Sequence, residues 1–207
     1  MPTASVLLVD DDTFTRTTLA AALSGVGYRV HPIGTAAQAM SVAQLNLIDV
    51  AVLDLDLGPG PTGIDLAHLL RRANSKMGLI FLTSYSDPRL LTSAELELPV
   101  GARYLLKSKL TELHSLVTLI DQTVAFPLKT SHRAPVADVK LNRNQIQILK
   151  LVAAGFSSSQ IAENLNLSIK SVEAAISRIN TNLGISDTDQ NKRVQLAKMY
   201  YQLIGKL

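Results

Sequence analysis

Acidic side chains stand where two apolar, strand-like runs of this sequence end. Asp10 and Asp11 follow the run Ser5–Val9, and Asp54 closes the run Val50–Asp54. If both runs are parallel strands, their carboxyl ends meet at one edge of a sheet, a few ångströms apart. Three carboxylates gathered there repel one another unless a cation lies between them. Because every ligand is an oxygen atom, the sequence predicts a Mg²⁺ site.

Two polar residues of another kind end the neighbouring runs. Thr83 closes the run Leu79–Thr83, and Lys107 directly follows Ala102–Leu106. Beside a metal-bound carboxylate, a hydroxyl and an ammonium group can hold phosphoryl oxygens. We therefore expect phosphoryl transfer onto Asp54, which gives an aspartyl phosphate. In this hypothesis Lys107 binds a phosphoryl oxygen and Thr83 forms a hydrogen bond with the product.

Each of these residues, taken alone, also has an ordinary structural explanation. Asp11 or Asp12 could cap a helix that begins at Thr13. Asp54 could be a loop-facing residue at a strand end, and Lys107 could be a solvated cation. Their joint occurrence at four different strand ends favours the phosphoryl site.

The elements that must position these residues alternate between strand and helix. Nearly continuous aliphatic runs are typical of parallel strands covered on both faces, and helical spacing separates them. This alternation predicts an α/β fold, a doubly wound five-stranded parallel sheet. The expected strands are Ser5–Val9, Tyr28–Ile33, Val50–Asp54, Leu79–Thr83 and Ala102–Leu106, and the expected helices are Thr13–Ser24, Thr35–Leu45, Ile64–Asn74, Pro88–Leu96 and Leu110–Val124.

Composition excludes several classes of protein. The chain has 207 residues, of which 47% are hydrophobic and 18% are charged, which is typical of one or two globular domains. The absence of cysteine excludes disulfides, thiolate zinc sites, iron–sulfur clusters and a cysteine nucleophile. Apolar runs stay shorter than the ~20 residues that a membrane helix needs, and the N-terminus lacks the pattern of a signal peptide. We expect a cytoplasmic protein with no membrane partner.

Charge divides the chain into two parts. Residues 1–124 carry 9 basic and 12 acidic side chains, whereas residues 125–207 carry 11 basic and 5 acidic ones. The stretch 125–139 contains two prolines and no helical period, so we interpret it as a linker. The sequence thus predicts a domain at 1–124 and a second domain at 140–207, whose positive charge suits a polyanionic partner.

The second domain is predicted to be all α-helical, with helices at 142–154, 157–165, 168–183 and about 189–204. Gly155 ends the first helix and Ser157 caps the second. After a tight turn, Ser168 caps a third helix with apolar positions on one face. A short helix, a turn of three residues and a longer helix form a helix-turn-helix, whose second helix can enter a DNA major groove.

The first domain resembles the receiver domain of two-component response regulators over residues 4–123. The motifs that carry the resemblance are Val9-Asp10-Asp11, Leu53-Asp54-Leu55-Asp56, Leu82-Thr83-Ser84 and Gly101-Ala102-Arg103-Tyr104-Leu105-Leu106-Lys107. The resemblance implies a flavodoxin-like fold and phosphorylation of Asp54 by a sensor histidine kinase. It implies that the backbone carbonyl of Asp56 joins Asp10, Asp11 and Asp54 around Mg²⁺. It also implies that Thr83, Ser84 and Tyr104 respond to the phosphoryl group.

The helical domain is similar to the LuxR-type (NarL/FixJ-like) DNA-binding domain over about residues 140–200. In the resemblance, Glu173, Ala174 and Ser177 face base edges, while Lys170, Ser171 and Arg178 suit phosphates. A glutamate can accept a hydrogen bond from cytosine N4, and an alanine methyl group can contact thymine. The family uses the last helix for dimerisation, which implies a homodimer on double-stranded DNA.

Two alternatives remain open on the sequence. Asp54 and Asp56 also resemble the Asp-x-Asp nucleophile motif of haloacid-dehalogenase-type phosphatases, although there the motif lies on the first strand and the metal-binding acids come later. The C-terminal helices could instead bind protein. We expect a non-enzymatic response regulator, in which phosphorylation controls dimerisation and DNA binding to regulate transcription; in a variant of this hypothesis, DNA binding is always active.

Overall fold

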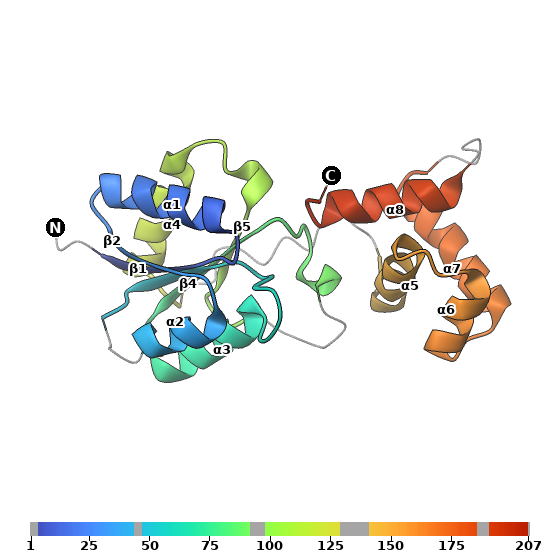
Figure 1. The fold of residues 1–207 in the computed structure, drawn as a ribbon, viewed down its shortest axis with the longest axis horizontal. Coiled ribbons are helices and arrows are strands. Elements are labelled where there is room, and N and C mark those ends of the chain that lie inside the picture. Colours follow the sequence, from blue (N-terminus) through green and yellow to red (C-terminus); the bar gives the residue numbers. More distant parts are fainter. Residues whose placement is uncertain (1–3, 44–46, 92–97, 129–140, 186–190, 207) are drawn as a thin grey trace. The chain divides into compact units, whose positions relative to one another are not determined.

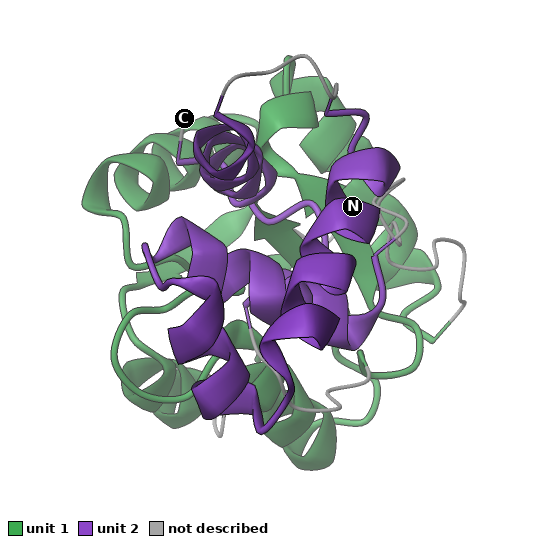
Figure 2. Ribbon diagram, turned by 90° about the vertical axis from the view of Figure 1, so that its right-hand side faces the viewer, with its two compact units in different colours: residues 1–83, 96–134 green, residues 84–95, 135–207 purple. Residues whose placement is uncertain are grey.

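The computed structural model describes residues 4–43, 47–91, 98–128, 141–185 and 191–206. Contacts divide the chain into two compact units, coloured separately in Figure 2. Unit 1 contains residues up to Thr83 and from Leu96 to Ala134. Unit 2 contains Ser84–Glu95 and Pro135–Leu207. The segment that follows Thr83 therefore packs with the C-terminal helices, which the sequence did not predict.

Unit 1 is built on the five-stranded parallel sheet that the alternating pattern predicts. Its strands follow the order β2-β1-β3-β4-β5, and every neighbouring pair is parallel. The predicted fold class is confirmed. The bounds agree with the predicted ones to within one residue at each end: β1 Ser5–Val9, β2 Arg29–Ile33, β3 Val50–Leu53, β4 Gly78–Thr83 and β5 Arg103–Leu106.

Among the described residues, four helices cover the two faces of this sheet. Helices α1 and α4 lie on one face, and α2 and α3 lie on the other (Figure 1). Their bounds are α1 Thr13–Gly25, α2 Ala36–Ala43, α3 Gly63–Ala73 and α4 Leu113–Ala125. One short 3₁₀ turn, η2 Lys107–Lys109, follows β5. The doubly wound arrangement brings the carboxyl ends of β1, β3, β4 and β5 to one edge.

Aliphatic side chains of the central strands form the core of unit 1. All residues of β1, β3 and β4 are buried, because helices cover both faces of these strands. Alternate residues point to opposite faces. One face packs with Leu23 of α1 and with Leu116 and Ile120 of α4. Strand β2 lies at the edge of the sheet and is partly exposed, as its mixed sequence suggests.

The helix expected over Pro88–Leu96 differs from the structure. Within the described residues, this segment holds a single 3₁₀ turn, η1 Pro88–Leu90. Asp87 caps the turn by accepting a hydrogen bond from the backbone of Arg89. The proline at the first position starts the turn, and Nζ of Lys150 in unit 2 donates a hydrogen bond of 3.1 Å to the carbonyl oxygen of Leu91, the residue after the turn.

The described residues of unit 2 form four helices, close to the predicted bounds: α5 Arg143–Ala153, α6 Ser158–Leu165, α7 Ile169–Asn182 and α8 Lys192–Leu203. Asn142 and Ser157 form capping boxes at the starts of α5 and α6. Ser168 caps α7, as the sequence predicts. Most of the expected linker 125–139 lies outside the described residues. Across the described part of the chain, none of the helices has the length and apolar character needed to cross a membrane.

Candidate metal centre and nucleic-acid interface

The three predicted acids meet at the carboxyl edge of the sheet. One carboxylate oxygen from each of Asp10, Asp11 and Asp54 can be chosen so that all lie within 4.8 Å of one another. Asp10 and Asp54 are buried, whereas Asp11 is exposed. A set of hard oxygen ligands with one open side is suited to a divalent cation that keeps several of its waters. The acidic pocket could therefore bind a metal.

Lys107 lies between the two buried carboxylates. Its Nζ atom is 2.7 Å from Oδ2 of Asp10 and 2.6 Å from Oδ2 of Asp54. The other carboxylate oxygen of Asp54 accepts a hydrogen bond of 2.6 Å from the backbone of Leu55. The lysine neutralises part of the charge that the buried acids bring together.

Burial and charge act in opposite directions on these groups. Burial raises the pKa of Asp10, although the hydrogen bond and charge of Lys107 partly offset this effect. Burial by itself lowers the pKa of Lys107, but the charge of Asp54 and the bonds to both acids outweigh it and raise that pKa. Lys107 therefore remains a cation inside the pocket.

The start of α1 holds the loop that carries Asp10 and Asp11. Asp12 caps this helix by accepting a hydrogen bond of 2.7 Å from the backbone of Thr15. The capping role considered for Asp11 or Asp12 thus falls to Asp12, which leaves the other two acids for the pocket. The Nη1 atom of Arg16 donates to the carbonyl oxygens of Asp10 and Asp11, at 2.6 and 3.2 Å. The sequence pattern did not indicate a role for this arginine.

The backbone of Gly63 packs closely against the backbone of Asp54 and so helps to fix its position. This glycine begins α3, and its backbone N–H donates to the carbonyl oxygen of Leu55 at 2.9 Å. A Cβ atom at Gly63 would overlap the carbonyl oxygen of Asp54. The close approach of the two backbones requires glycine here, and it fixes the turn that follows β3.

The remaining predicted residues of the first domain lie on β4 and β5. Thr83 is fully buried at the end of β4. Tyr104 is buried on β5, with its ring centroid 6.3 Å from that of Phe81. Ser84 belongs to unit 2, where it lies close to Gly205. The structure thus places Thr83 and Tyr104 in the unit that contains the acidic pocket, and Ser84 in the other unit.

The six residues expected to contact DNA share the exposed face of one helix. All of them are exposed on α7, whereas Val172 and Ile179 of the same helix are buried in unit 2. The turn before α7 is tight because Asn166 adopts a left-handed conformation, with φ of 53°. The exposed residues are Lys170, Ser171, Glu173, Ala174, Ser177 and Arg178.

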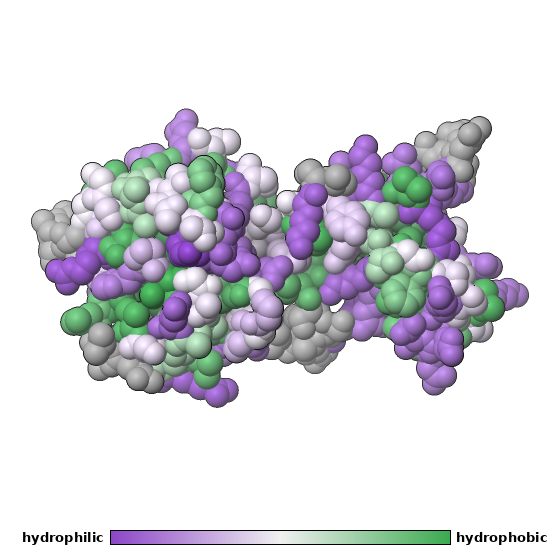
Figure 3. Space-filling model, in the orientation of Figure 1, coloured by the Kyte–Doolittle hydropathy of each residue, from purple (hydrophilic) through white to green (hydrophobic). Residues whose placement is uncertain are grey.

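Polar contacts hold the helix-turn-helix against the last helix. Arg193 of α8 donates to the carbonyl oxygen of Phe156 at 2.6 Å and to Oγ of Ser158 at 3.2 Å. These bonds fix the start of α6. The face of unit 2 visible in Figure 3 is largely hydrophilic, with scattered apolar residues.

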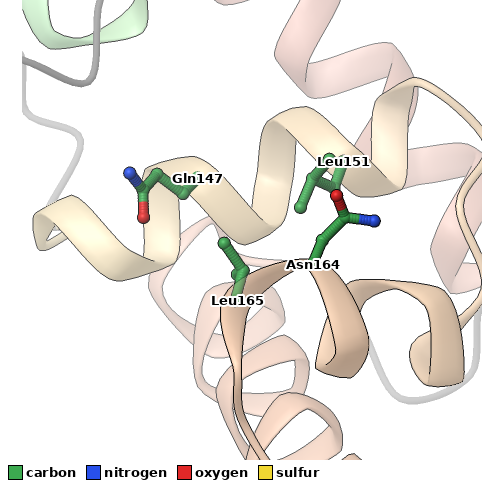
Figure 4. Close-up of a pocket in the computed structure, with 4 residues that line it drawn as sticks. All are labelled: Gln147, Leu151, Asn164 and Leu165. Carbon is green, nitrogen blue, oxygen red and sulfur yellow. The ribbon is translucent and has the colours of Figure 1, made fainter.

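A small hollow of about 190 Å³ lies between α5 and α6 (Figure 4). Its described lining comprises two amide and two leucine side chains, namely Gln147, Leu151, Asn164 and Leu165. None of the four can titrate or act as a nucleophile at neutral pH. We assign it no chemistry.

Comparisons with known families cover both parts of the chain. Residues 6–118 match the response regulator receiver domain. Residues 139–199 match the bacterial regulatory proteins of the luxR family. The first match includes every predicted residue of the acidic pocket, and the second includes the exposed face of α7. Together they favour the receiver interpretation over the phosphatase alternative.

Two bacterial proteins are similar to this chain over most of its length. Nodulation protein W of Bradyrhizobium diazoefficiens is 27% identical over 169 residues, which cover 79% of this chain and 73% of that protein. The tetrathionate response regulatory protein TtrR of Salmonella typhimurium is 26% identical over 178 residues, covering 85% of this chain and 84% of the relative.

A solved structure of similar fold spans both units. It is RcsB from Salmonella enterica serovar Typhimurium, bound to the promoter rprA in the presence of a phosphomimetic, BeF3⁻. Its TM-score is 0.54 at 20% identity, and the alignment covers 95% of this chain and 98% of that chain. At this identity the likeness concerns the fold.

Proposed function

Because this chain belongs to the response regulators, as a match to the receiver domain over more than half of its length shows, we propose that it is a DNA-binding transcription regulator controlled by phosphorylation of Asp54. The phosphoryl donor is a sensor histidine kinase, and the chain itself turns over no small substrate. The observation that carries the proposal is the pocket in which Lys107 joins Asp10 and Asp54.

Mg²⁺ is the proposed cofactor. Asp10, Asp11 and Asp54 would hold it through carboxylate oxygens, and Asp56 would add its backbone carbonyl. The fit rests on the convergence of the three acids and on their hard oxygen ligands. When bound, the ion would neutralise charge on the phosphoryl oxygens.

The chain's own residues account for the transfer step. A carboxylate oxygen of Asp54 attacks phosphorus; the bond from phosphorus to the donor's imidazole nitrogen breaks, and that nitrogen keeps the electron pair. Lys107 already contacts Asp54 and needs only a small movement to bind a phosphoryl oxygen. Thr83, at the end of the neighbouring strand, would donate its hydroxyl proton to another. Ser84 and Tyr104 would change their side-chain conformations together with Thr83.

The second domain supplies the proposed output. Lys170, Ser171 and Arg178 would contact phosphates, while Glu173, Ala174 and Ser177 would face base edges. Support comes from their common exposure on α7 and from the match to the luxR family. We also propose that α8 forms a homodimer on DNA, that the boundaries are 1–124, 125–139 and 140–207, and that the protein acts in the cytoplasm.

Mass spectrometry tests the phosphorylation. Incubation with acetyl phosphate and Mg²⁺ should add the mass of one phosphoryl group to the wild type, and the adduct should be lost in mild base. The variant Asp54→Asn should remain unmodified. A wild type that gains no labile adduct, or a variant that gains one, would refute the proposal.

A band-shift titration at several salt concentrations tests the DNA interface. Lys170→Ala and Arg178→Ala should each weaken binding to all sequences and lower the salt slope by roughly one. Lys76→Ala, an exposed lysine of unit 1, is the matched control and should change neither. Affinity that does not depend on salt would favour the protein-binding alternative for these helices.

A further inference from the structure

Arg16, the fourth residue of α1, binds the loop that carries two of the acids in the pocket. Its Nη1 atom donates to the carbonyl oxygens of Asp10 and Asp11, at 2.6 and 3.2 Å, and its Nη2 atom donates to Oγ1 of Thr13 at 3.1 Å. The side chain is half-buried, and in the described part of the chain it forms no salt bridge with a carboxylate. The guanidinium group therefore acts mainly on the backbone of this loop.

The loop after β2 leaves room for this guanidinium group. Gly34 directly follows β2, and a Cβ atom there would lie 3.3 Å from Nη1 and 3.4 Å from Cζ of Arg16. A larger side chain at position 34 would therefore have to displace the guanidinium group. The same two loops are also joined through the backbone, because the N–H of Asp10 donates to the carbonyl oxygen of Ile33 at 3.2 Å. Arg16 thus contacts two neighbouring loops at the carboxyl edge of the sheet.

The three acids of the pocket differ in the contacts that hold their carboxylates. Those of Asp10 and Asp54 each accept hydrogen bonds from Lys107 and from a backbone N–H. The carboxylate of Asp11 is exposed and accepts no hydrogen bond from another residue that the structure describes. Its direction therefore depends on the backbone of Asp11, whose carbonyl oxygen is bound by Arg16.

We infer that Arg16 is a positioning residue for the divalent cation. By fixing the peptide groups that follow Asp10 and Asp11, it keeps the carboxylate of Asp11 within reach of the other two acids. A guanidinium group suits this task, because its donors form a rigid planar fork. The inference rests on the proposed function, since it requires Mg²⁺ in the acidic pocket.

Position and charge predict opposite effects of removing this side chain. A cation near a metal site repels the metal ion, so its removal by itself strengthens metal binding. The loss of a residue that orients a metal ligand instead weakens metal binding, commonly by about 10- to 100-fold. Arg16→Met keeps the apolar stem and removes the guanidinium group. We expect this variant to bind Mg²⁺ more weakly by roughly tenfold or more, because orientation of the ligand outweighs the repulsion.

Titration of the full chain with MgCl₂, followed by amide chemical shifts in NMR spectra, measures this affinity and shows whether each variant is folded. Arg16→Lys keeps the charge without the planar fork, so it should also weaken Mg²⁺ binding, by roughly threefold or more. Arg72→Met removes an exposed arginine of α3 and should bind Mg²⁺ as the wild type does. If the wild type binds no Mg²⁺, the proposed function itself fails. If it does, wild-type or tighter binding in either folded Arg16 variant overturns the inference.

A double-mutant cycle tests whether Arg16 acts through Asp11. Asp11→Asn should weaken Mg²⁺ binding, and the addition of Arg16→Met should then weaken it by less than about twofold further. Phosphorylation by acetyl phosphate gives a second measure. In Arg16→Met the Mg²⁺ concentration for half-maximal rate should rise with the dissociation constant, while the rate at saturating Mg²⁺ stays within about threefold of the wild type. Equal weakening by Arg16→Met with and without Asp11→Asn would mean that the arginine does not position this ligand.

Discussion

At the scale of single residues, the positive charge of Lys107 balances the negative charges of the buried acids in the pocket. Nζ of Lys107 contacts both buried carboxylates, which would otherwise repel each other. A divalent cation near the same oxygens would compete with this ammonium group. We therefore expect Lys107 to stabilise the metal-free protein and to weaken its affinity for a metal ion.

Replacing Lys107 should separate these two effects. Lys107→Met keeps the apolar stem but removes the charge, so we expect lower stability without Mg²⁺ and roughly tenfold tighter Mg²⁺ binding. The shift of the thermal unfolding midpoint with Mg²⁺ concentration measures both. Lys109→Met, an exposed neighbour, should behave as the wild type. Equal or weaker Mg²⁺ binding in Lys107→Met would contradict this account of the pocket.

Gly63 offers a second test at this scale. Gly63→Ala would drive a methyl group into the carbonyl oxygen of Asp54 and displace the turn after β3. Since displacements of about 1 Å can cost a factor of about 100 in rate, we expect phosphorylation by acetyl phosphate to slow by about that factor. Gly25→Ala, at a glycine with open space around it, should keep the wild-type rate. A full rate in Gly63→Ala would show that the close approach is dispensable.

The sequence could predict the acids and Lys107 because each directly follows an apolar strand. It could not reveal Gly63, because the close approach of α3 to Asp54 is a tertiary contact between residues nine apart. Arg16 was missed for a similar reason, since its partners are backbone carbonyls. The available signal was a basic residue one turn into a helix that directly follows three acidic residues.

At the scale of elements, alternation of strand and helix was enough to predict the sheet and its covering helices. The segment Pro88–Leu96 shows the limit of this reasoning. Its local pattern favours a helix. In the structure, however, Lys150 donates a hydrogen bond to the carbonyl oxygen of Leu91, and Arg89 donates one to the carbonyl oxygen of Leu141. These partners lie more than 50 residues away in the sequence, so a local pattern cannot contain them.

A hydrogen bond joins α4 to Tyr28, the residue before β2, and predicts a pH effect on stability. The hydroxyl of Tyr28 donates to Asp121 at 2.5 Å. Burial, and then this carboxylate, raise the pKa of Tyr28 well above its ordinary value near 10. The unfolded chain therefore loses this proton at a lower pH than the folded one, and stability must fall as pH rises above about 10.

Tyr28→Phe isolates this contribution. At neutral pH the variant should be less stable by about 1 kcal/mol, the usual cost of one hydrogen bond. Above about pH 10 its stability should fall less steeply than that of the wild type. Urea unfolding at a series of pH values measures both, and Tyr201→Phe, an exposed position, should keep the wild-type slope. Parallel curves for wild type and Tyr28→Phe would refute the assignment.

At the scale of the whole molecule, the charge division and the two family matches agree on separate input and output domains. What the sequence could not predict is that the described residues Ser84–Leu91 pack with the C-terminal helices. The packing of this segment in unit 2 depends on contacts between residues far apart in the sequence, such as Ser86 and Leu203, which are separated by 117 positions.

Reciprocity between the two proposed sites gives a prediction for the full chain. If a phosphoryl group on Asp54 raises DNA affinity by some factor, bound DNA must raise the affinity for a phosphoryl mimic by the same factor. We expect a factor between about 5 and 150, the usual range for allosteric coupling. Titration of beryllofluoride, followed by its ¹⁹F signal, with and without a DNA fragment selected by this protein, measures it. The double variant Lys170→Ala, Arg178→Ala should bind beryllofluoride normally and lose the effect of DNA. Equal affinities with and without DNA in the wild type would mean that the two domains act independently and that DNA binding is always active.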